Sequence, residues 1–455
     1  MFLQSGIVGH SREESMKLIS KFLPVSIIIF KEDYEDKKDF QSLVKGINRL
    51  YVIENGVKRP YIAIDQEGGK VVQIPWIEYN PSNAFLGSYG NSAFTKLVGS
   101  RVGYDLKLLG LSWQMAPDLD LANRYNPVIS ERSFSSDIQT VSAHGSAYIH
   151  GLQEAGIAAT AKHFPCHGGV AEDSHKVLPD DKRSVNAIMS DAQPFLEAMS
   201  SKVASIMMGH VRYPSIDPDY PASLSLKFYD LVRRYFGYRG VLVTDSVDMG
   251  AVVKGYSNKE IAKLASNGGA DVIETVDIYQ AIEINDFLNM KDPKGSMERI
   301  DNLLPEKKLV FEPPVDLIKS VAMLNNYKLR INRFLDPNEE TFLYFLEAER
   351  GSMVEEVFSN EAEVFRRLGN RFRIMKYDPS SKKKVKQIII VGRNEHIKSR
   401  IGTILESAKN RNAFFLSTGI PADVGLFQSD ISYVSLLSTK VESILGGIYR
   451  AFNLF

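Results

Sequence analysis

Residues 162–175 carry many side chains that can act as acids, bases or nucleophiles. The segment reads Lys-His-Phe-Pro-Cys-His-Gly-Gly-Val-Ala-Glu-Asp-Ser-His and holds three of the eight histidines of the chain. It follows a short apolar run, residues 156–161, with the composition of a buried strand. Loops that follow strands in α/β enzymes bring catalytic side chains together. We therefore expect half of an active site here and the other half elsewhere in the chain.

Two pairs of residues in this segment suggest specific roles. In an extended loop, residues two apart project to one side, so Asp173 can accept a hydrogen bond from one ring nitrogen of His175. The other ring nitrogen would then face a substrate as an acid or base. The alternative is a surface histidine beside an incidental acid. Lys162 and His163 either supply donors to a polyhydroxylated ligand or serve as a lid and a solvated charge.

Asp245 is the first candidate for the other half of the site. It comes directly after the β-branched run 241–244, and a carboxylate at that place can act as a nucleophile. The equally weighted alternative is an N-cap of the next helix, a role that Ser246 can also fill. Asp65 and Arg132 carry the same ambiguity between ligand binding and structure.

The remaining histidines do not indicate a metal centre. His167 and His210 are assigned as structural hydrogen-bonding residues. The possible metal ligands are His163, His167, Asp173 and His175. Their spacing matches no standard zinc site, so we predict neither a metal nor another cofactor.

The elements that position these residues alternate between strands and helices. Nearly every predicted strand ends in polar residues, which favours a (β/α)₈ TIM-like barrel over a doubly wound sheet with a single switch point. The chain thus belongs to the α/β class. The seven predicted strands cover residues 25–30, 61–64, 112–116, 156–161, 204–208, 241–244 and 270–273.

The alternation fades near residue 296, which predicts three regions. Residues 1–310 form the catalytic barrel, 311–370 a helical linker region, and 371–455 a small α/β domain. The linker is expected to be helical because Phe342, Phe345 and Leu346 recur at helical spacing. The small domain is expected to contain a strand at 387–394, a helix at 397–409 and a strand at 414–416.

Composition excludes several classes of protein. The 455 residues carry zero formal net charge, so neither nucleic acid nor an anionic membrane is favoured as a partner. The single cysteine excludes an internal disulfide framework and a multi-cysteine zinc site. Residues 1–20 lack the pattern of a signal peptide, so we expect a cytoplasmic protein. The oligomeric state stays open.

Five spaced segments together resemble glycoside hydrolase family 3, in its β-N-acetylglucosaminidase branch. This resemblance implies a (β/α)₈ barrel and cleavage of terminal β-linked N-acetylglucosamine. The segments are Ala63–Gly69, Asn126–Ile129 with Arg132–Phe134, Lys162–Pro165 with His167 and Gly168, Asp173–His175, and Gly240–Asp245 with Met249.

The resemblance also implies a role for each matching position. Asp245 would attack the anomeric carbon and form a covalent glycosyl-enzyme intermediate. His175, oriented by Asp173, would protonate the leaving oxygen and later deprotonate water. The residues implied to bind the sugar are Asp65, Arg132, Lys162, His163 and Met207.

The chain departs from the family pattern at four positions. Cys166 stands where the family usually has glycine, and Gln73 and Lys70 stand where arginines are common. Glu172 adds a negative charge beside Asp173.

Our interpretation is a retaining exo-β-N-acetylglucosaminidase acting on amino-sugar fragments, such as those of cell-wall recycling. A β-glucosidase or β-xylosidase of the same family is one alternative, against which the intact loop with Asp173 and His175 argues. A phosphorylase is another, because an imidazole in place of a second carboxylate repels phosphate less. A non-catalytic sugar-binding protein would need a lost nucleophile, whereas Asp245 is present.

Overall fold

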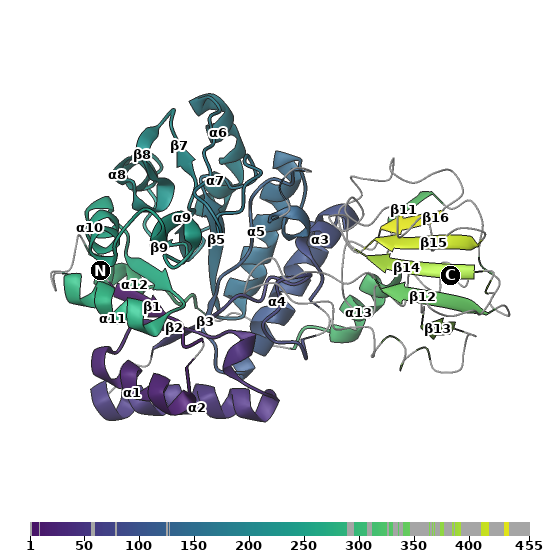
Figure 1. Ribbon diagram of the computed structural model, residues 1–455, viewed down its shortest axis with the longest axis horizontal. Coiled ribbons are helices and arrows are strands. Elements are labelled where there is room, and N and C mark those ends of the chain that lie inside the picture. Colours follow the sequence, from purple (N-terminus) through teal and green to yellow (C-terminus); the bar gives the residue numbers. More distant parts are fainter. Residues whose placement is uncertain are drawn as a thin grey trace.

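The computed structural model describes most of the first 324 residues and short segments beyond them. The described residues are 2–8, 10–55, 60–77, 80–123, 126, 128–288, 295–306, 312–324, 327–330, 335, 340–345, 364, 366, 368, 374–376, 385, 387–392, 411–417 and 432–435. They form a closed parallel barrel surrounded by helices and a separate six-stranded sheet (Figure 1). The predicted (β/α)₈ barrel is confirmed.

The barrel contains eight strands, one more than the sequence predicted. The missed strand is the first, β1 (Phe2–Ser5), which closes the barrel by pairing with β10 and β2. It is only four residues long and half polar, so it carries no alternating pattern. Around the barrel the order is β1, β10 (Val272–Thr275), β9 (Val241–Thr244), β6 (Ser205–Met208), β5 (Ala158–Phe164), β4 (Trp113–Gln114), β3 (Tyr61–Ile64) and β2 (Ser26–Ile28).

Apolar side chains fill the inside of the barrel. Trp113 is fully buried there, and its Nε1 donates to the hydroxyls of Thr160 and Ser205 at 2.9 Å each. This interior cluster is separate from the larger one between the strands and the helices. Because side chains alternate along a strand, the residue two places beyond an interior one points to the same side. Val243 therefore leads to Asp245 at the carboxyl end, where the mouth of the barrel lies.

The surrounding helices begin at polar caps that the sequence supplies. Ser11, Asn91, Asp137 and Ser257 each accept a backbone N–H in the first turn of their helix. The helices of the barrel domain are α1 (Arg12–Phe22), α2 (Lys37–Asn55), α3 (Asn83–Tyr89), α4 (Ser92–Leu108), α5 (Ile138–Glu154), α6 (Val185–Asp191), α7 (Gln193–Ser200), α8 (Leu226–Asp230), α9 (Gly250–Val253), α10 (Asn258–Gly268), α11 (Ile278–Phe287) and α12 (Ser296–Asp301).

Two glycines allow α4 and α5 to approach closely. A Cβ at Gly151 would lie 2.3 Å from the carbonyl oxygen of Lys96, and one at Gly99 would lie 2.6 Å from that of Tyr148. Side chains at these positions would force the helices apart.

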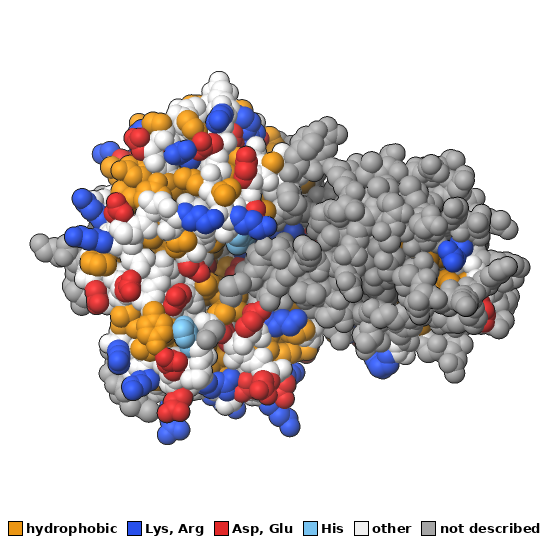
Figure 2. Space-filling model, viewed as in Figure 1, with side chains coloured by type: hydrophobic (Ala, Val, Ile, Leu, Met, Phe, Trp, Pro, Cys, Tyr) orange, Lys and Arg blue, Asp and Glu red, His pale blue; other side chains and the backbone are white. Residues whose placement is uncertain are grey.

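One face of the barrel domain mixes both signs of charge. On the face shown in Figure 2, basic and acidic side chains are interspersed without a patch of one sign. In the part of the chain that the structure describes, no helix has both the length and the apolar character needed to cross a bilayer.

The prediction that residues 311–370 form a helical linker region is wrong in part. It contains one helix, α13 (Val315–Leu324), but also β11 (Tyr327–Arg330) and β12 (Thr341–Phe345) of the second sheet. Phe342 and Phe345 therefore lie in a strand, because the run Thr-Phe-Leu-Tyr-Phe has high β propensity and pairs with two neighbours. Leu346 and the predicted helix at 397–409 lie outside the described residues, and the domain boundaries stay a prediction.

The second sheet is mostly parallel. Among the described strands of this sheet, only β11 runs antiparallel to its neighbour, β16. The strand order is β11, β16 (Ser432–Ser435), β15 (Asn412–Ser417), β14 (Gln387–Gly392), β12 and β13 (Ile374–Lys376).

The segment around α13 is fastened to the barrel. Arg101 of α4 donates to the carbonyl oxygen of Pro313 at 2.9 Å and pairs with Glu312. Ile318 of α13 is fully buried in the cluster between the strands and helices of the barrel.

Candidate active site

Asp245 lies at the mouth of the barrel, directly after β9. Its backbone N–H donates to the carbonyl oxygen of Met208 at 2.9 Å, and its Oδ1 accepts the N–H of Ser246 at 2.8 Å. The N-cap of the next helix, α9, is Met249. Asp245 therefore does not cap that helix, and the structural alternative considered for it is wrong.

The carboxyl of Asp245 is held in its charged form. Burial alone would raise its pKa, since only 8% of the residue is exposed. The imidazoles of His210, His163 and His175, which are protonated in the acidic range where this carboxyl titrates, together with the N–H of Ser246 outweigh burial, and the pKa falls to about 2. An ionised carboxylate at the mouth of a barrel is a competent nucleophile.

His210 supports the turn that carries Asp245. Its Nε2 lies 2.9 Å from the carbonyl oxygen of Ser246 and its Nδ1 lies 2.7 Å from the hydroxyl of Ser223. These partners assign the proton to Nε2. Burial lowers the pKa of His210, which keeps it neutral, in line with the structural role expected for it.

The predicted contact between Asp173 and His175 is present. Asp173 Oδ1 lies 2.7 Å from Nδ1 of His175 and also accepts the backbone N–H of His175 at 3.0 Å. Burial opposes ionisation of Asp173, but these hydrogen bonds and the charge of the imidazole lower its pKa to about 2. Because Nδ1 is occupied, Nε2 is the ring nitrogen left for a ligand.

Backbone hydrogen bonds join the loop that bears His175 to the segment that follows Asp245. The N–H of Gly250 donates to the carbonyl oxygen of His175, and that of Ala251 to the carbonyl oxygen of Ser174, both at 3.0 Å. A Cβ at Gly250 would lie 2.7 Å from the carbonyl oxygen of His175. Two segments far apart in sequence thus meet at one end of the barrel.

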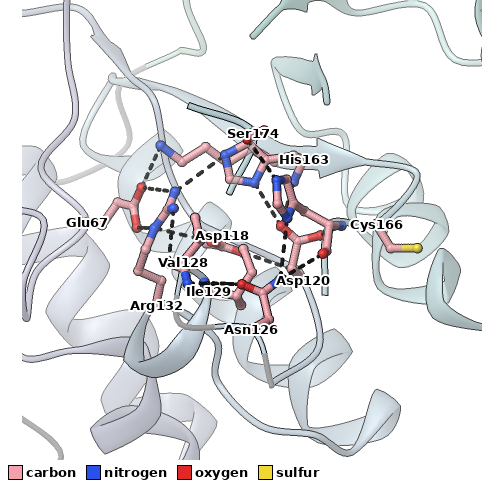
Figure 3. A network of polar contacts seen from close by, with 12 residues as sticks. Glu67, Asp118, Asp120, Asn126, Val128, Ile129, Arg132, His163, Cys166 and Ser174 are labelled. Atoms are coloured by element: carbon pink, nitrogen blue, oxygen red, sulfur yellow. Dashed lines mark hydrogen bonds and ion pairs between the residues drawn. The ribbon is translucent and has the colours of Figure 1, made fainter. Parts of the chain in front are cut away.

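His167 holds the same loop in place through hydrogen bonds. Its Nε2 lies 2.9 Å from the hydroxyl of buried Ser174, and its backbone N–H donates to Asp120. Burial lowers the pKa of His167 to about 4, so it is neutral at physiological pH. Figure 3 shows Ser174 and Asp120 in one network of polar contacts.

A second cluster of charges is built around Glu67. Arg132 donates to both carboxylate oxygens of Glu67 at 2.9 Å (Figure 3). Nζ of Lys162 lies 2.6 Å from Glu67 Oε1 and 2.5 Å from Asp65 Oδ1. All four residues are buried. Burial would raise the pKa of Glu67, but the two cations lower it to about 2. Such paired groups can hold sugar hydroxyls by charge-assisted hydrogen bonds.

His163 belongs to the same cluster. Its Nδ1 lies 2.8 Å from Asp120 Oδ2 and its Nε2 lies 3.4 Å from Arg132 Nη2 (Figure 3). Burial lowers the pKa of His163 well below its ordinary value. Burial also raises the pKa of Asp120 to about 6 and that of Asp118 well above its usual range.

The structure brings all eight predicted site residues to the carboxyl end of the barrel. Met207 is buried within the interior cluster, beside the strand that leads to Asp245. Sequence reasoning assigned no role to Glu67, Asp118 or Asp120. The available signal was that each acid follows a predicted strand.

One group of side chains has the spacing of metal ligands. Single ligand atoms of Asp118, Asp120 and His163 lie within 4.8 Å of one another. However, Arg132 Nε lies 3.4 Å from Asp118 Oδ2, so a cation already faces this carboxylate. We assign no metal to the group.

The structure gives the surroundings of three of the four positions that depart from the family pattern. Cys166 is buried, and its Sγ lies 3.8 Å from Arg183 Nη2. Gln73 accepts the backbone N–H of Lys31 at 2.9 Å. Glu172 is exposed, and the acid that contacts His175 is Asp173.

Known proteins resemble the chain at the level of both sequence and fold. The "Beta-hexosaminidase" of Haemophilus influenzae (strain ATCC 51907 / DSM 11121 / KW20 / Rd) is 30% identical over 333 residues, which cover 71% of this chain and 88% of that protein. The "Beta-hexosaminidase" of Methylococcus capsulatus is 31% identical, over 60% of this chain and 82% of that protein.

Solved structures share the fold. A glycoside hydrolase family 3 β-N-acetylglucosaminidase from Paenibacillus sp. str. FPU-7 superposes with a TM-score of 0.87 at 23% identity, covering 100% of this chain and 95% of that one. A β-glucoside phosphorylase superposes with a TM-score of 0.76 at 15% identity, covering 99% of this chain and 90% of that one.

The family model described as "Glycosyl hydrolase family 3 N terminal domain" matches residues 3–303, all of the eight-stranded barrel except its first residue. The chain therefore belongs to glycoside hydrolase family 3 and is a glycoside hydrolase related to the β-hexosaminidases.

Proposed function

We propose that the protein is a retaining exo-β-N-acetylglucosaminidase that works through a covalent glycosyl-enzyme intermediate. The observation that supports this proposal best is that Asp245 and the loop bearing His175 lie at the same end of the barrel. Retention requires a nucleophile on one face of the sugar and an acid/base group on the other.

In the first step, a carboxylate oxygen of Asp245 forms a bond to the anomeric carbon. The glycosidic C–O bond breaks, and the leaving oxygen takes a proton from Nε2 of His175. In the second step, water attacks the anomeric carbon, gives its proton to His175 and releases Asp245. Asp173 is the positioning residue that holds Nδ1 of the imidazole at 2.7 Å.

We assign sugar binding to the second cluster. Lys162, Arg132 and Asp65 are already paired and buried, so their hydrogen-bonding groups are fixed before a ligand arrives. His163 is neutral and presents Nε2 beside Arg132, while Met207 supplies an apolar wall. The β-hexosaminidases that the chain resembles support an amino sugar, and fragments of cell-wall polymers are one source of it.

The test is a panel of 4-nitrophenyl β-glycosides carrying N-acetylglucosamine, glucose or xylose. We expect turnover of the N-acetylglucosaminide, with the β configuration of the first-formed product seen by NMR. A first-formed α product would refute the covalent route. Asp245→Asn should abolish turnover while the circular dichroism spectrum stays that of the wild type, and persistent activity would remove Asp245 from the mechanism.

Phosphorolysis is a second candidate function, in which phosphate replaces water in the second step. The favouring observation is that the proposed acid/base is the imidazole of His175 rather than a second carboxylate, so a phosphate acceptor is repelled less on that face of the sugar. Repeating the panel with and without phosphate separates the two functions. A sugar 1-phosphate as the main product would indicate a phosphorylase.

A further inference from the structure

A buried acid at the mouth of the barrel has no role in the mechanism above. Glu274 lies on β10, the strand next to the one that leads to Asp245, and only 4% of it is exposed. Val272, two residues earlier, belongs to the interior cluster. Alternation along the strand therefore points Glu274 into the barrel, toward the mouth.

The side chain of Glu274 is held in place by its neighbours. Gln4 of β1 donates from Nε2 to Glu274 Oε2 at 2.8 Å. The backbone N–H of Glu274 donates to the hydroxyl of Thr244 at 3.1 Å, and its carbonyl oxygen accepts the N–H of Val247 at 2.9 Å. Both of these contacts flank Asp245, so Glu274 and Asp245 are fixed relative to each other.

The surroundings of Glu274 favour a neutral carboxylic acid. Burial raises its pKa well above the ordinary value, and the nearby carboxylates of Asp65, Asp245 and Asp248 raise it further, while Lys162 opposes them. A protonated carboxyl both donates and accepts a hydrogen bond. Because Gln4 donates to Oε2, the remaining capacity of Glu274 is available to a polar ligand group.

The strand order divides the mouth of the barrel into two flanks between β9 and β3. Strand β3, which leads to Asp65, lies on the opposite side of the eight-stranded barrel from β9. A pyranose with its anomeric carbon at Asp245 and its far hydroxyls at Asp65 has its 2-substituent on one flank and its 5-hydroxymethyl group on the other. One flank, through β6 and β5, carries Met207 and Lys162; the other, through β10 and β1, carries Glu274.

We propose that Glu274 is a specificity-determining residue that hydrogen-bonds the 6-hydroxyl of the bound sugar, an inference that rests on the proposed function. The methyl of a 2-acetamido group suits the apolar flank that Met207 provides. A primary hydroxyl suits a side chain that can donate and accept. Gln4 is then the positioning residue for Glu274.

The test compares 4-nitrophenyl N-acetyl-β-glucosaminide with its 6-deoxy analogue. Wild-type kcat/KM should be about 10- to 100-fold lower for the 6-deoxy substrate, the range for loss of a buried hydrogen bond. Glu274→Leu should lower kcat/KM on the parent substrate by a similar factor and leave the 6-deoxy value nearly unchanged. Glu274→Gln, which copies the neutral acid, should stay within a few-fold of wild type on both.

Equal losses on both substrates for Glu274→Leu would give Glu274 a purely structural role and overturn the proposal. If the wild-type enzyme has the same kcat/KM on both substrates, the proposal is overturned as well. This comparison needs no variant, so it remains decisive even if Glu274→Leu does not fold. Glu197→Leu, on the exposed side of α7, is the control for a lost acid away from the site. Absence of wild-type activity on the parent substrate would instead refute the proposed function itself.

Discussion

Replacing Asp173 by Asn isolates the contribution of one charge to the acid/base step. The amide keeps an acceptor for His175 but loses the negative charge that favours a protonated imidazole. A charge-assisted hydrogen bond contributes about 1.5–3 kcal/mol, against about 1 kcal/mol for a neutral one. The 2.7 Å contact between the two side chains belongs to the stronger kind.

The pKa of Asp173 gives a second estimate of the same quantity. One pKa unit corresponds to about 1.4 kcal/mol. The fall in its pKa from 3.8 to about 2 is thus equivalent to about 2 kcal/mol, an upper value because the side chain is 18% exposed. The difference between the two kinds of hydrogen bond, about 0.5–2 kcal/mol, corresponds to a loss in rate of about 2- to 30-fold, and the pKa corresponds to about 30-fold. We take the upper part of this range, about 10- to 30-fold, as the expected loss.

The loss should depend on the leaving group. Asp173→Asn should lower kcat/KM about 10- to 30-fold for a methyl or disaccharide substrate, whose leaving oxygen needs a proton. It should lower kcat/KM less than about 3-fold for a 2,4-dinitrophenyl glycoside, which departs without one. Stopped assays on both substrates measure this ratio.

Glu172→Gln is the matched control, because it removes an acid from the same loop at an exposed position. It should leave both rates within about 2-fold of wild type. Equal losses on the two substrates for Asp173→Asn would refute the role of Asp173 as the partner of a proton donor, as would a large effect of Glu172→Gln.

Three further outcomes follow from the geometry. Lys162→Met leaves two buried carboxylates short of a cation and should lower the free energy of unfolding in urea by about 3–5 kcal/mol, whereas exposed Lys202→Met should change it by less than about 0.5 kcal/mol. Gly250→Val places a Cβ 2.7 Å from the carbonyl oxygen of His175 and should lower kcat by displacing that loop, and wild-type kcat would contradict this. Burial lowers the pKa of His167 from 6.5 to about 4, so this residue contributes stability that is present above about pH 6.5 and is lost as pH falls toward 4. Urea titrations across this range should show a decrease of about 3 kcal/mol in the free energy of unfolding from this residue. An unchanged urea midpoint would refute its neutral state.

Local sequence patterns predicted most of the barrel but could not predict how it closes. The runs 61–64 and 241–244 coincide with β3 and β9, since both are apolar and end at an acid. Strand β1 was missed because its identity depends on pairing with β10, a strand about 270 residues away, rather than on its own composition. In the second sheet, the run 341–345 was misassigned because its aromatic residues fit either periodicity.

The site residues were predictable wherever their type and place after a strand were informative. Asp245 and His175 stood out for this reason. Glu67 did not, because its importance comes from two cations supplied by distant segments, Arg132 and Lys162. The chemistry of Glu274 likewise depends on burial and on neighbouring acids, neither of which a single sequence displays.

The contacts between the α13 segment and the barrel limit how far the chain can be shortened from its C-terminal side. A fragment ending at residue 303, the last one matched by the family model, would lack Ile318 and the carbonyl group of Pro313. The outer surface of the barrel would then expose apolar side chains to water, and Arg101 would lose a buried acceptor. The smallest autonomous unit of this enzyme therefore extends at least to Ile318 within α13, and shortened versions should keep that residue.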